Sequence, residues 1–174
     1  MATSGRSAKR PRPKRDGRTK RARLTIIVED RLWRNEPQAI ALVRRAGREA
    51  LELAARRQAP RTLTILLSSD ARLKELNALF RGKRKPTNVL SFPASERKYL
   101  GDIAIAYGVA SREAKNEGKR LAAHVAHLAA HGVLHLLGYD HGNEPEAAIM
   151  EALETRVLAR LGFPDPYARI RAAA

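Results

Sequence analysis

Cysteine does not occur among the 174 residues of this chain. Its absence excludes disulfide frameworks, thiolate zinc sites, iron–sulfur clusters and thiol nucleophiles, so any metal ion would be bound by nitrogen or oxygen atoms. Long apolar runs are also missing: no segment approaches about 18 uninterrupted apolar residues, and the first residues lack the apolar stretch of a secretory signal. We therefore expect a protein without a membrane span, located in the cytoplasm.

Acidic residues are few relative to basic ones: 18 Asp and Glu stand against 34 Lys and Arg, a formal net charge of +16. Ten of the basic residues, with a single acid, fall within the first 23 positions. Residues 1–22 contain too few apolar side chains to offset the entropy of ordering, which predicts a disordered basic arm. This arm is either a solubilising extension or a salt-sensitive phosphate-binding tail. Pro11 and Pro13 disfavour a third option, an amphipathic transit peptide.

Residues 23–174 are expected to form a single domain. Alternating or β-branched apolar residues predict strands at 24–29, 62–67 and 100–106 and an extended segment at 86–93. Apolar residues at helical spacing predict helices from 37 to the break at Pro60, from 69 or 70 to 80, and at 111–117, 121–137 and 144–161. The fold class is α/β (α+β), a single-layer sheet of about four strands covered by helices. The helix at 121–137 is apolar all round apart from its histidines, which predicts a buried central helix.

All five histidines lie between positions 124 and 141. His131 and His135 are four residues apart, so their rings leave a helix on the same face. Gly138 permits a left-handed turn that would end the helix and bring His141 back toward them. Three imidazoles can then bind one metal ion, and zinc, nickel, copper and iron all suit such ligands. A zinc site with three protein ligands keeps a fourth position for water.

Histidines also have ordinary structural roles. A single histidine on an apolar helix is usually a hydrogen-bonded core residue. Three converging imidazoles favour a metal site, because a buried helix gains nothing from them unless they share an ion or a proton network. His124 and His127 precede the trio on the same helix. They either support the metal site or are core and helix-surface residues.

The spacing of the trio coincides with the metzincin protease pattern H-E-x-x-H-x-x-G-x-x-H, including the glycine at 138. Gly132 stands where that pattern has the glutamate that acts as general base. Peptide hydrolysis by that mechanism is therefore disfavoured. Cleavage of a phosphodiester does not require that glutamate, because a metal ion can polarise the phosphoryl oxygen while cationic side chains neutralise the developing charge.

Four motifs in the chain occur in the order seen in a known family. They are R-G-K-R-K-P-T-N-V-L-S-F-P at 81–93, L-G-D-I-A-I at 100–105, H-G-V-L-H-L-L-G-Y-D-H at 131–141 and M-E-A-L-E at 150–154. Through them the chain resembles the bacterial YbeY-type rRNA maturation endoribonucleases, over about residues 24–167. The resemblance implies a catalytic zinc ion (Zn2+) held by His131, His135 and His141, and single-stranded RNA as substrate. It also implies a role in 16S rRNA 3′-end maturation and small ribosomal subunit quality control, with small-subunit ribosomal proteins or an assembly GTPase as partners.

The functionally important arginine of that family falls on Arg81. At the end of a predicted helix, its guanidinium could bind a phosphate through two hydrogen bonds and stabilise the transition state. Lys83, Arg84 and Lys85 follow and would add contacts to RNA. The residues taken alone favour a solvated basic turn, and the resemblance reverses that preference.

Other polar residues lie close to these motifs. Asp102 and Asp140 could each orient a ligand imidazole through its other ring nitrogen, although turn and strand-end structure is the simpler interpretation. Thr87, Asn88 and Ser91 offer hydrogen-bonding groups near the proposed cleft, and Asn88 and Ser91 could equally close turns.

The sequence thus predicts a zinc-dependent endoribonuclease in which Arg81 binds the scissile phosphate and the basic surface binds RNA. The alternative is a non-catalytic ribosome-assembly factor that binds RNA and holds a structural metal. A metallohydrolase of another substrate, proteins included, is disfavoured by Gly132 and by the charge of +16. Two features depart from the family: the stretch at 94–99 is short, which affects the cleft rim, and the basic arm is additional, which suggests extra nonspecific RNA affinity.

Overall fold

A four-stranded sheet in the order β1-β2-β4-β3 forms the centre of the computed structural model, which describes residues 23–54, 62–96 and 98–171. The parallel strands are β1 (Arg23–Val28), β2 (Thr62–Ser68) and β4 (Tyr99–Ala106), and β3 (Val89–Pro93) pairs antiparallel with β4 at one edge. The three predicted strands are confirmed, and the extended segment 86–93 is a strand only from Val89 onward. The predicted disordered arm at 1–22 lies outside the described residues.

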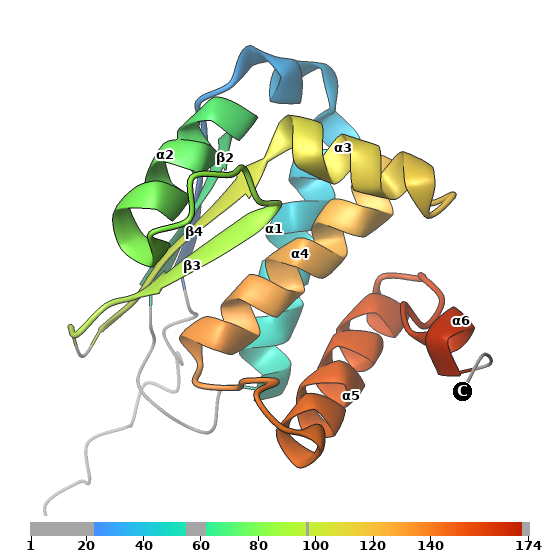
Figure 1. Ribbon diagram of the computed structural model, residues 1–174. Helices are drawn as coiled ribbons and strands as arrows, with labels where there is room; N and C mark the ends of the chain where they lie inside the picture. The colour runs from blue at the N-terminus through green and yellow to red at the C-terminus, as the bar shows by residue number, and fades with distance from the viewer. Residues whose placement is uncertain (1–22, 55–61, 97, 172–174) are drawn as a thin grey trace, which may run out of the picture.

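Helices cover both faces of this sheet (Figure 1). They are α1 (Pro37–Ala54), α2 (Asp70–Arg81), α3 (Tyr107–Asn116), α4 (Leu121–Leu136) and α5 (Glu144–Arg160), with a short 3-10 helix η1 (Arg31–Asn35) and a final turn α6 (Ala168–Arg171) that the sequence did not predict. Helices α1 and α4 lie on one face and α2 on the other, while α5 packs against α1 and α4. The predicted α+β architecture is therefore confirmed. Within the described residues, no helix combines the length and apolar character that crossing a membrane requires.

Strand β4 shows why the sheet has two covered faces. Its alternate residues Ile103 and Ile105 are fully buried in the core shared with α1 and α4, whereas Ala104 and Ala106 belong to the smaller core under α2. Side chains of a strand alternate between faces, so a continuous apolar strand requires cover on both sides. The alanine-rich sequence of α4 lets this helix lie close to the sheet, and it is buried along most of its length as predicted.

Helix α3 begins at Tyr107, four residues before the predicted start. Its first turn has no side-chain cap of its own; Asp70 of α2 accepts a hydrogen bond from the Val109 backbone N–H at 2.9 Å and pairs with Arg112 at 2.8 Å. A carboxylate near a helix N-terminus satisfies its free N–H groups and its dipole. This cap comes from a residue 39 positions away in the sequence, so local capping signals do not reveal it.

Candidate metal centre and the neighbouring basic loop

The three histidines of the predicted trio converge on one point. Their ligand nitrogens all lie within 4.8 Å of one another. His131 and His135 leave successive turns of α4, and their Nε2 atoms are 3.0 Å apart. Gly138 has a φ of 89° just beyond α4, the left-handed conformation that the sequence predicts. After this turn, the ring of His141 lies 5.1 Å from that of His135 and 5.5 Å from that of His131.

This donor set fits one zinc-type ion. Two nitrogens that each lie about 2.0–2.1 Å from a tetrahedral ion are roughly 3.4 Å apart, close to the 3.0 Å between the Nε2 atoms of His131 and His135. His131 and His135 are half-buried and His141 is exposed. The point that the three nitrogens share is therefore reachable from solvent, as a site with a fourth position for water or a substrate oxygen requires.

Hydrogen bonds fix the tautomers of the two helical histidines. Nδ1 of His131 lies 2.7 Å from Oε1 of Glu154, and Nδ1 of His135 lies 3.1 Å from the backbone carbonyl of Tyr139. Both partners are acceptors, so each Nδ1 carries the proton and donates it. Each Nε2 then presents a lone pair toward the shared point, which is the form that binds a metal.

The ionisation of these groups also suits metal binding. Burial lowers the pKa of His135, and the adjacent imidazoles of His131 and His141 lower it further. Burial by itself raises the pKa of Glu154, yet hydrogen bonds from His127, His131 and Tyr167 outweigh that effect and lower the pKa to about 2. At neutral pH His135 is therefore uncharged, and its neighbour His131 donates to a buried carboxylate that can only accept hydrogen bonds.

Glu154 ends the M-E-A-L-E motif at 150–154, yet sequence reasoning gave it no role at the histidine site. It is fully buried on α5, between apolar Met150 and Leu158. Besides His131 it receives a hydrogen bond from the Tyr167 hydroxyl, and its Oε2 lies 2.8 Å from Nε2 of His127. An acid within the apolar stripe of a helix was the available signal, because charged residues are rarely fully buried without partners.

The other two histidines have different partners. His127 belongs to the Glu154 network and so supports the trio indirectly, whereas Nε2 of His124 lies 2.9 Å from Oε2 of Glu113 on α3. The sequence left both roles open. The two histidines lie one turn apart on α4. His127 supports the candidate metal centre, and His124 links α4 to α3.

The two aspartates proposed to orient imidazoles have other roles. Asp102 accepts a hydrogen bond from the Tyr99 hydroxyl, and this contact within β4 does not involve a histidine. Asp140 accepts from the His141 backbone N–H at 2.8 Å, while its Oδ1 is 3.9 Å from Nδ1 of His135. The closer acceptor of the His135 proton is the Tyr139 carbonyl. The Tyr139 carbonyl and Glu154 thus orient the two helical imidazoles, and both aspartates have the turn and strand contacts of the simpler interpretation of the sequence.

Gly132 faces the sheet at a point where α4 lies very close to it. A Cβ atom there would be 2.9 Å from Cγ2 of Ile103 and 3.2 Å from Oγ of Ser91. No side chain fits without displacing its neighbours. The position that holds the general base in the protease pattern is therefore directed into the core in this fold, which explains why the pattern is broken at this residue.

Replacing Glu154 with glutamine is expected to lower zinc affinity by about 10- to 100-fold. The carboxylate accepts from His127, His131 and Tyr167 together, whereas the amide nitrogen of glutamine is a donor and would oppose one of them. Competition with a zinc indicator measures the affinity. Glu151→Gln, a partly exposed change on the same helix, is the matched control and should bind zinc like the unchanged protein. Equal affinities in E154Q and the unchanged protein would remove Glu154 from the metal centre.

Two buried or half-buried asparagines hold the basic loop that follows α2. Asn77, which is 3% exposed, donates from Nδ2 to the backbone carbonyl of Lys85 at 2.7 Å. At the far end of the loop, Nδ2 of Asn88 donates to Glu113 at 3.0 Å. Arg81 ends α2, and the glycine after it caps the helix with a φ of 67°. The loop is therefore anchored at both ends, and Asn88 connects it to α3.

Exposed cations line this loop. Arg81, Lys83, Arg84 and Lys85, the predicted RNA-binding residues, are all exposed. Among the residues that the structure describes, none offers their charged groups a hydrogen bond or an ion pair. Four unpaired positive charges on one short segment form a surface suited to a polyanion.

Strand β3 connects the basic loop to the metal centre. Oγ of Ser91 donates to the backbone carbonyl of Gly132 at 3.3 Å, one residue after the first candidate ligand. The next residue of β3, Phe92, contacts the ring of Phe80 with centroids 4.8 Å apart, and Phe80 immediately precedes Arg81. The end of α2 and the histidine turn of α4 thus both contact β3, which brings two of the predicted site motifs to the same strand.

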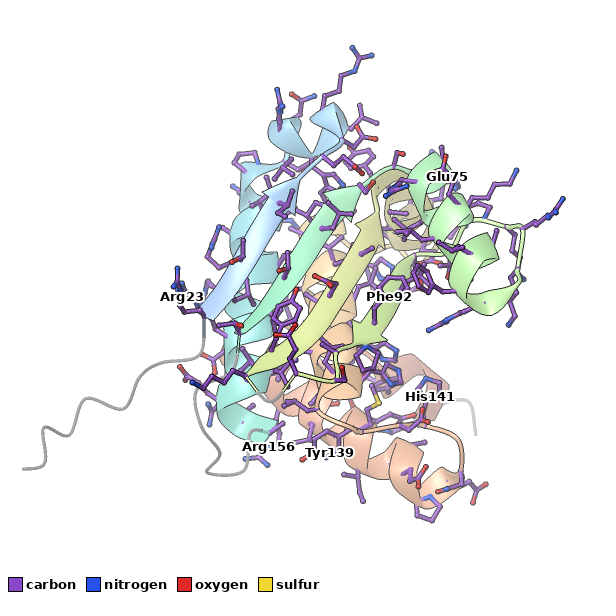
Figure 2. The ribbon with its side chains drawn as sticks, turned by 90° about the vertical axis from the view of Figure 1, so that its left-hand side faces the viewer. Arg23, Glu75, Phe92, Tyr139, His141 and Arg156 are labelled. Carbon is purple, nitrogen blue, oxygen red and sulfur yellow. The ribbon has the colours of Figure 1, made fainter. Side chains whose placement is uncertain are left out.

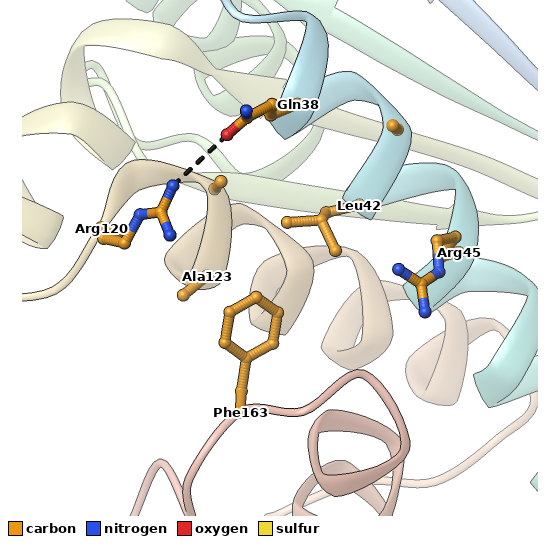
Figure 3. A pocket seen from close by; sticks show the side chains of 8 residues that line it. Gln38, Leu42, Arg45, Arg120, Ala123 and Phe163 are labelled. Carbon is orange, nitrogen blue, oxygen red and sulfur yellow. Dashed lines mark hydrogen bonds between the residues drawn. The ribbon is translucent and has the colours of Figure 1, made fainter.

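A separate pocket of about 280 Å³ lies between α1 and the start of α4 (Figure 3). Leu42 and Arg45 line it from α1, and Phe163 lines it from the segment after α5. Arg120 donates to the Gln38 side chain at 3.3 Å beside it. None of the candidate metal ligands lines this pocket, so it is separate from the histidine site.

Comparison with known proteins gives the family. A family model described as endoribonuclease YbeY matches residues 29–162. A protein named endoribonuclease YbeY from Rhodopseudomonas palustris (strain BisA53) is 50% identical over 152 residues, which cover 82% of this chain and 88% of that protein. A protein of the same name from Bradyrhizobium diazoefficiens is 46% identical over 153 residues, which cover 82% of this chain and 83% of that protein. The solution structure of TM1509 from Thermotoga maritima shares the fold, with a TM-score of 0.57 at 22% identity over 86% of this chain and 93% of that one. The chain therefore belongs to the endoribonuclease YbeY family.

Proposed function

We propose that this chain is a metal-dependent endoribonuclease that cuts single-stranded RNA, with a zinc ion bound by His131, His135 and His141. The proposal is carried by the convergence of three imidazoles whose ligand nitrogens lie within 4.8 Å, two of them held in the ligand tautomer. Relatives 50% and 48% identical that are named endoribonucleases support the reaction class. A net charge of +16 supports a polyanionic substrate.

The residues around the trio have distinct tasks in this proposal. A zinc ion bound there would polarise a phosphoryl oxygen and lower the pKa of a water molecule to about 7. Glu154 holds the ring of His131, and the Tyr139 carbonyl holds that of His135, so both nitrogens point at the same place without reorganisation.

Arg81 is the residue that we assign to the scissile phosphate. Its guanidinium is planar and permanently charged, so it can donate two parallel hydrogen bonds to phosphate oxygens and neutralise the charge that develops on them. Lys83, Arg84 and Lys85 would bind the flanking phosphates, which fixes the strand in register without reading its sequence.

In the cell, we propose, the substrate is the 3′ precursor end of 16S rRNA, in maturation and quality control of the small ribosomal subunit. The four-motif resemblance and the family membership support this assignment. Small-subunit ribosomal proteins or an assembly GTPase are the proposed partners, and the cytoplasm is the proposed location.

Chelation tests the metal dependence of the reaction. The purified protein is incubated with a single-stranded RNA carrying a 16S 3′ precursor end, and the products are separated on a denaturing gel. We expect cleavage that stops when a chelator removes the metal and returns when zinc is added in excess, because the histidines alone cannot supply a Lewis acid. A duplex of the same sequence should stay intact.

Two results would contradict this function. A His135→Ala protein purified in parallel controls for contaminating ribonuclease, and equal cleavage by both proteins would assign the activity to a contaminant. A protein that binds the RNA but cuts none of it at any zinc concentration would instead support a non-catalytic assembly factor with a structural metal.

A further inference from the structure

An exposed aromatic ring, Phe80, lies next to the basic loop and packs against the half-buried ring of Phe92. Phe80, on the last turn of α2, is 62% exposed, and its ring is tilted by 59° against that of Phe92 with centroids 4.8 Å apart. Only three phenylalanines occur in the whole chain, and two of them form this pair. A ring exposed to this degree gains little from burial, so its position is not explained by the core.

The pair lies beside the basic loop, on the face of the sheet that α2 covers. Arg81 and the exposed cations at 83–85 directly follow Phe80. Ser91, the residue before Phe92, points to the opposite face of β3, where it donates to the backbone carbonyl of Gly132 beside the candidate ligands. The edge strand β3 therefore separates the pair from the histidines by the thickness of the sheet. Figure 2 shows Phe92 at the β3 edge of the sheet, with His141 farther along the same side of the molecule.

We infer that the Phe80–Phe92 pair is a stacking site for an unpaired nucleobase of the RNA strand whose phosphates bind the basic loop. One exposed ring, Phe80, next to a row of unpaired cations matches the bases and the phosphates of a single strand, because bases stack on aromatic side chains while phosphates attract positive charge. An acidic or apolar protein partner would use only one of these features. The inference rests on the proposed ribonuclease function.

Stacking at this pair also provides a physical basis for preferring single strands. In a duplex, each base is already stacked and paired, so its face is not available to a side chain without unstacking. A flexible strand can turn one base onto Phe80 without that cost. The phosphate next to that base then lies against the cations that follow Phe80, which positions the strand for Arg81.

Equilibrium binding to a 2′-O-methyl oligonucleotide tests the inference. Fluorescence anisotropy compares a labelled single strand with an abasic strand of the same length, and a gel after each titration verifies that the strand is intact. We expect the unchanged protein to bind the strand with bases about tenfold more tightly than the abasic strand, and Phe80→Ala to lose this preference. Leu79→Ala, at the adjacent and 75% exposed position, is the matched control and should retain it.

Two further measurements separate stacking from charge and from misfolding. Phe80→Trp should keep the preference, and its emission should be quenched by the strand with bases, since the native Trp33 is fully buried. The slope of log Kd against log salt should be the same for Phe80→Ala and the unchanged protein. Lys83→Ala should lower that slope by about 0.7, as expected for one lost phosphate contact on a single strand.

The outcomes distinguish this inference from the function on which it rests. If the unchanged protein binds and cuts RNA but Phe80→Ala keeps the full preference for bases, the stacking site is wrong and the ribonuclease function stands. If the unchanged protein binds neither strand, both are wrong. If Phe80→Ala binds RNA normally but no longer binds small ribosomal subunits, the pair is a protein-docking surface instead.

Discussion

Replacing His135 with alanine should remove the bound metal ion and RNA cleavage together. The unchanged protein should contain one zinc ion per chain by elemental analysis, and His135→Ala close to none, because two remaining imidazoles are a poor site for a four-coordinate ion. Loss of a Lewis acid that stabilises the transition state by about 4 kcal/mol corresponds to a roughly 1,000-fold slower cleavage. Single-turnover cleavage of the single-stranded RNA measures this loss.

Two companion variants exclude a folding defect. His141 is exposed in the segment after α4, so His141→Ala removes a ligand at little cost to the core and should show the same loss of metal. His124→Gln changes a histidine of the same helix that contacts Glu113 rather than the trio, and should keep one ion per chain. Full metal content in His135→Ala would show that this residue is not a ligand.

The grouping of the histidines followed from spacing alone. Positions 131 and 135 must share a helical face, and a glycine at 138 marks the left-handed end of the helix; both rules depend on local backbone geometry. The structure places the three rings together and Gly138 at a φ of 89° accordingly. Local geometry was sufficient because the whole ligand set lies within 11 residues of sequence, from 131 to 141.

The hydrogen bonds that support these candidate ligands depend on contacts between distant segments. Glu154 is on a different helix, and its role follows only from the packing of α5 against α4. The carbonyl of Tyr139 carries no sequence signal, because every residue has one. Reasoning from residue type offered Asp102 and Asp140, the nearest acids in the motifs, only as possible orienting groups and preferred turn and strand-end structure for both, which agrees with the bond between Asp102 and Tyr99.

The same distinction applies to the fold. The N-terminal cap of α2 by Ser69 and its glycine end at 82 are local features, and the helix forms within one residue of the predicted limits. Helix α3 starts earlier than predicted because Asp70, from another element, caps it. Elements whose ends depend on their own residues were predictable, and an end that depends on tertiary contact was not.

Replacing Arg81 with alanine is the second change expected to have a large effect. The guanidinium is proposed to stabilise charge that develops on the phosphate, a contribution comparable to removing an oxyanion donor, which costs about 100- to 1,000-fold in rate. Zinc content should not change, because Arg81 contacts no metal ligand among the described residues. Arg81→Lys keeps the positive charge but cannot form the bidentate hydrogen bond to the phosphate, so it should recover only part of the cleavage rate.

Arg72→Ala is the control that decides between local chemistry and general charge. Arg72 lies on the first turn of the same helix and pairs with Glu75 at 3.0 Å, so its loss changes the net charge equally at the opposite end of α2. If Arg81 acts on the scissile phosphate, R81A slows single-turnover cleavage at saturating RNA while R72A stays within about twofold, since exposed charges contribute little individually. If both variants weaken RNA binding equally and cut normally once RNA is saturating, Arg81 only attracts the strand. The rate at saturation is therefore the quantity to measure, because binding alone changes in either case.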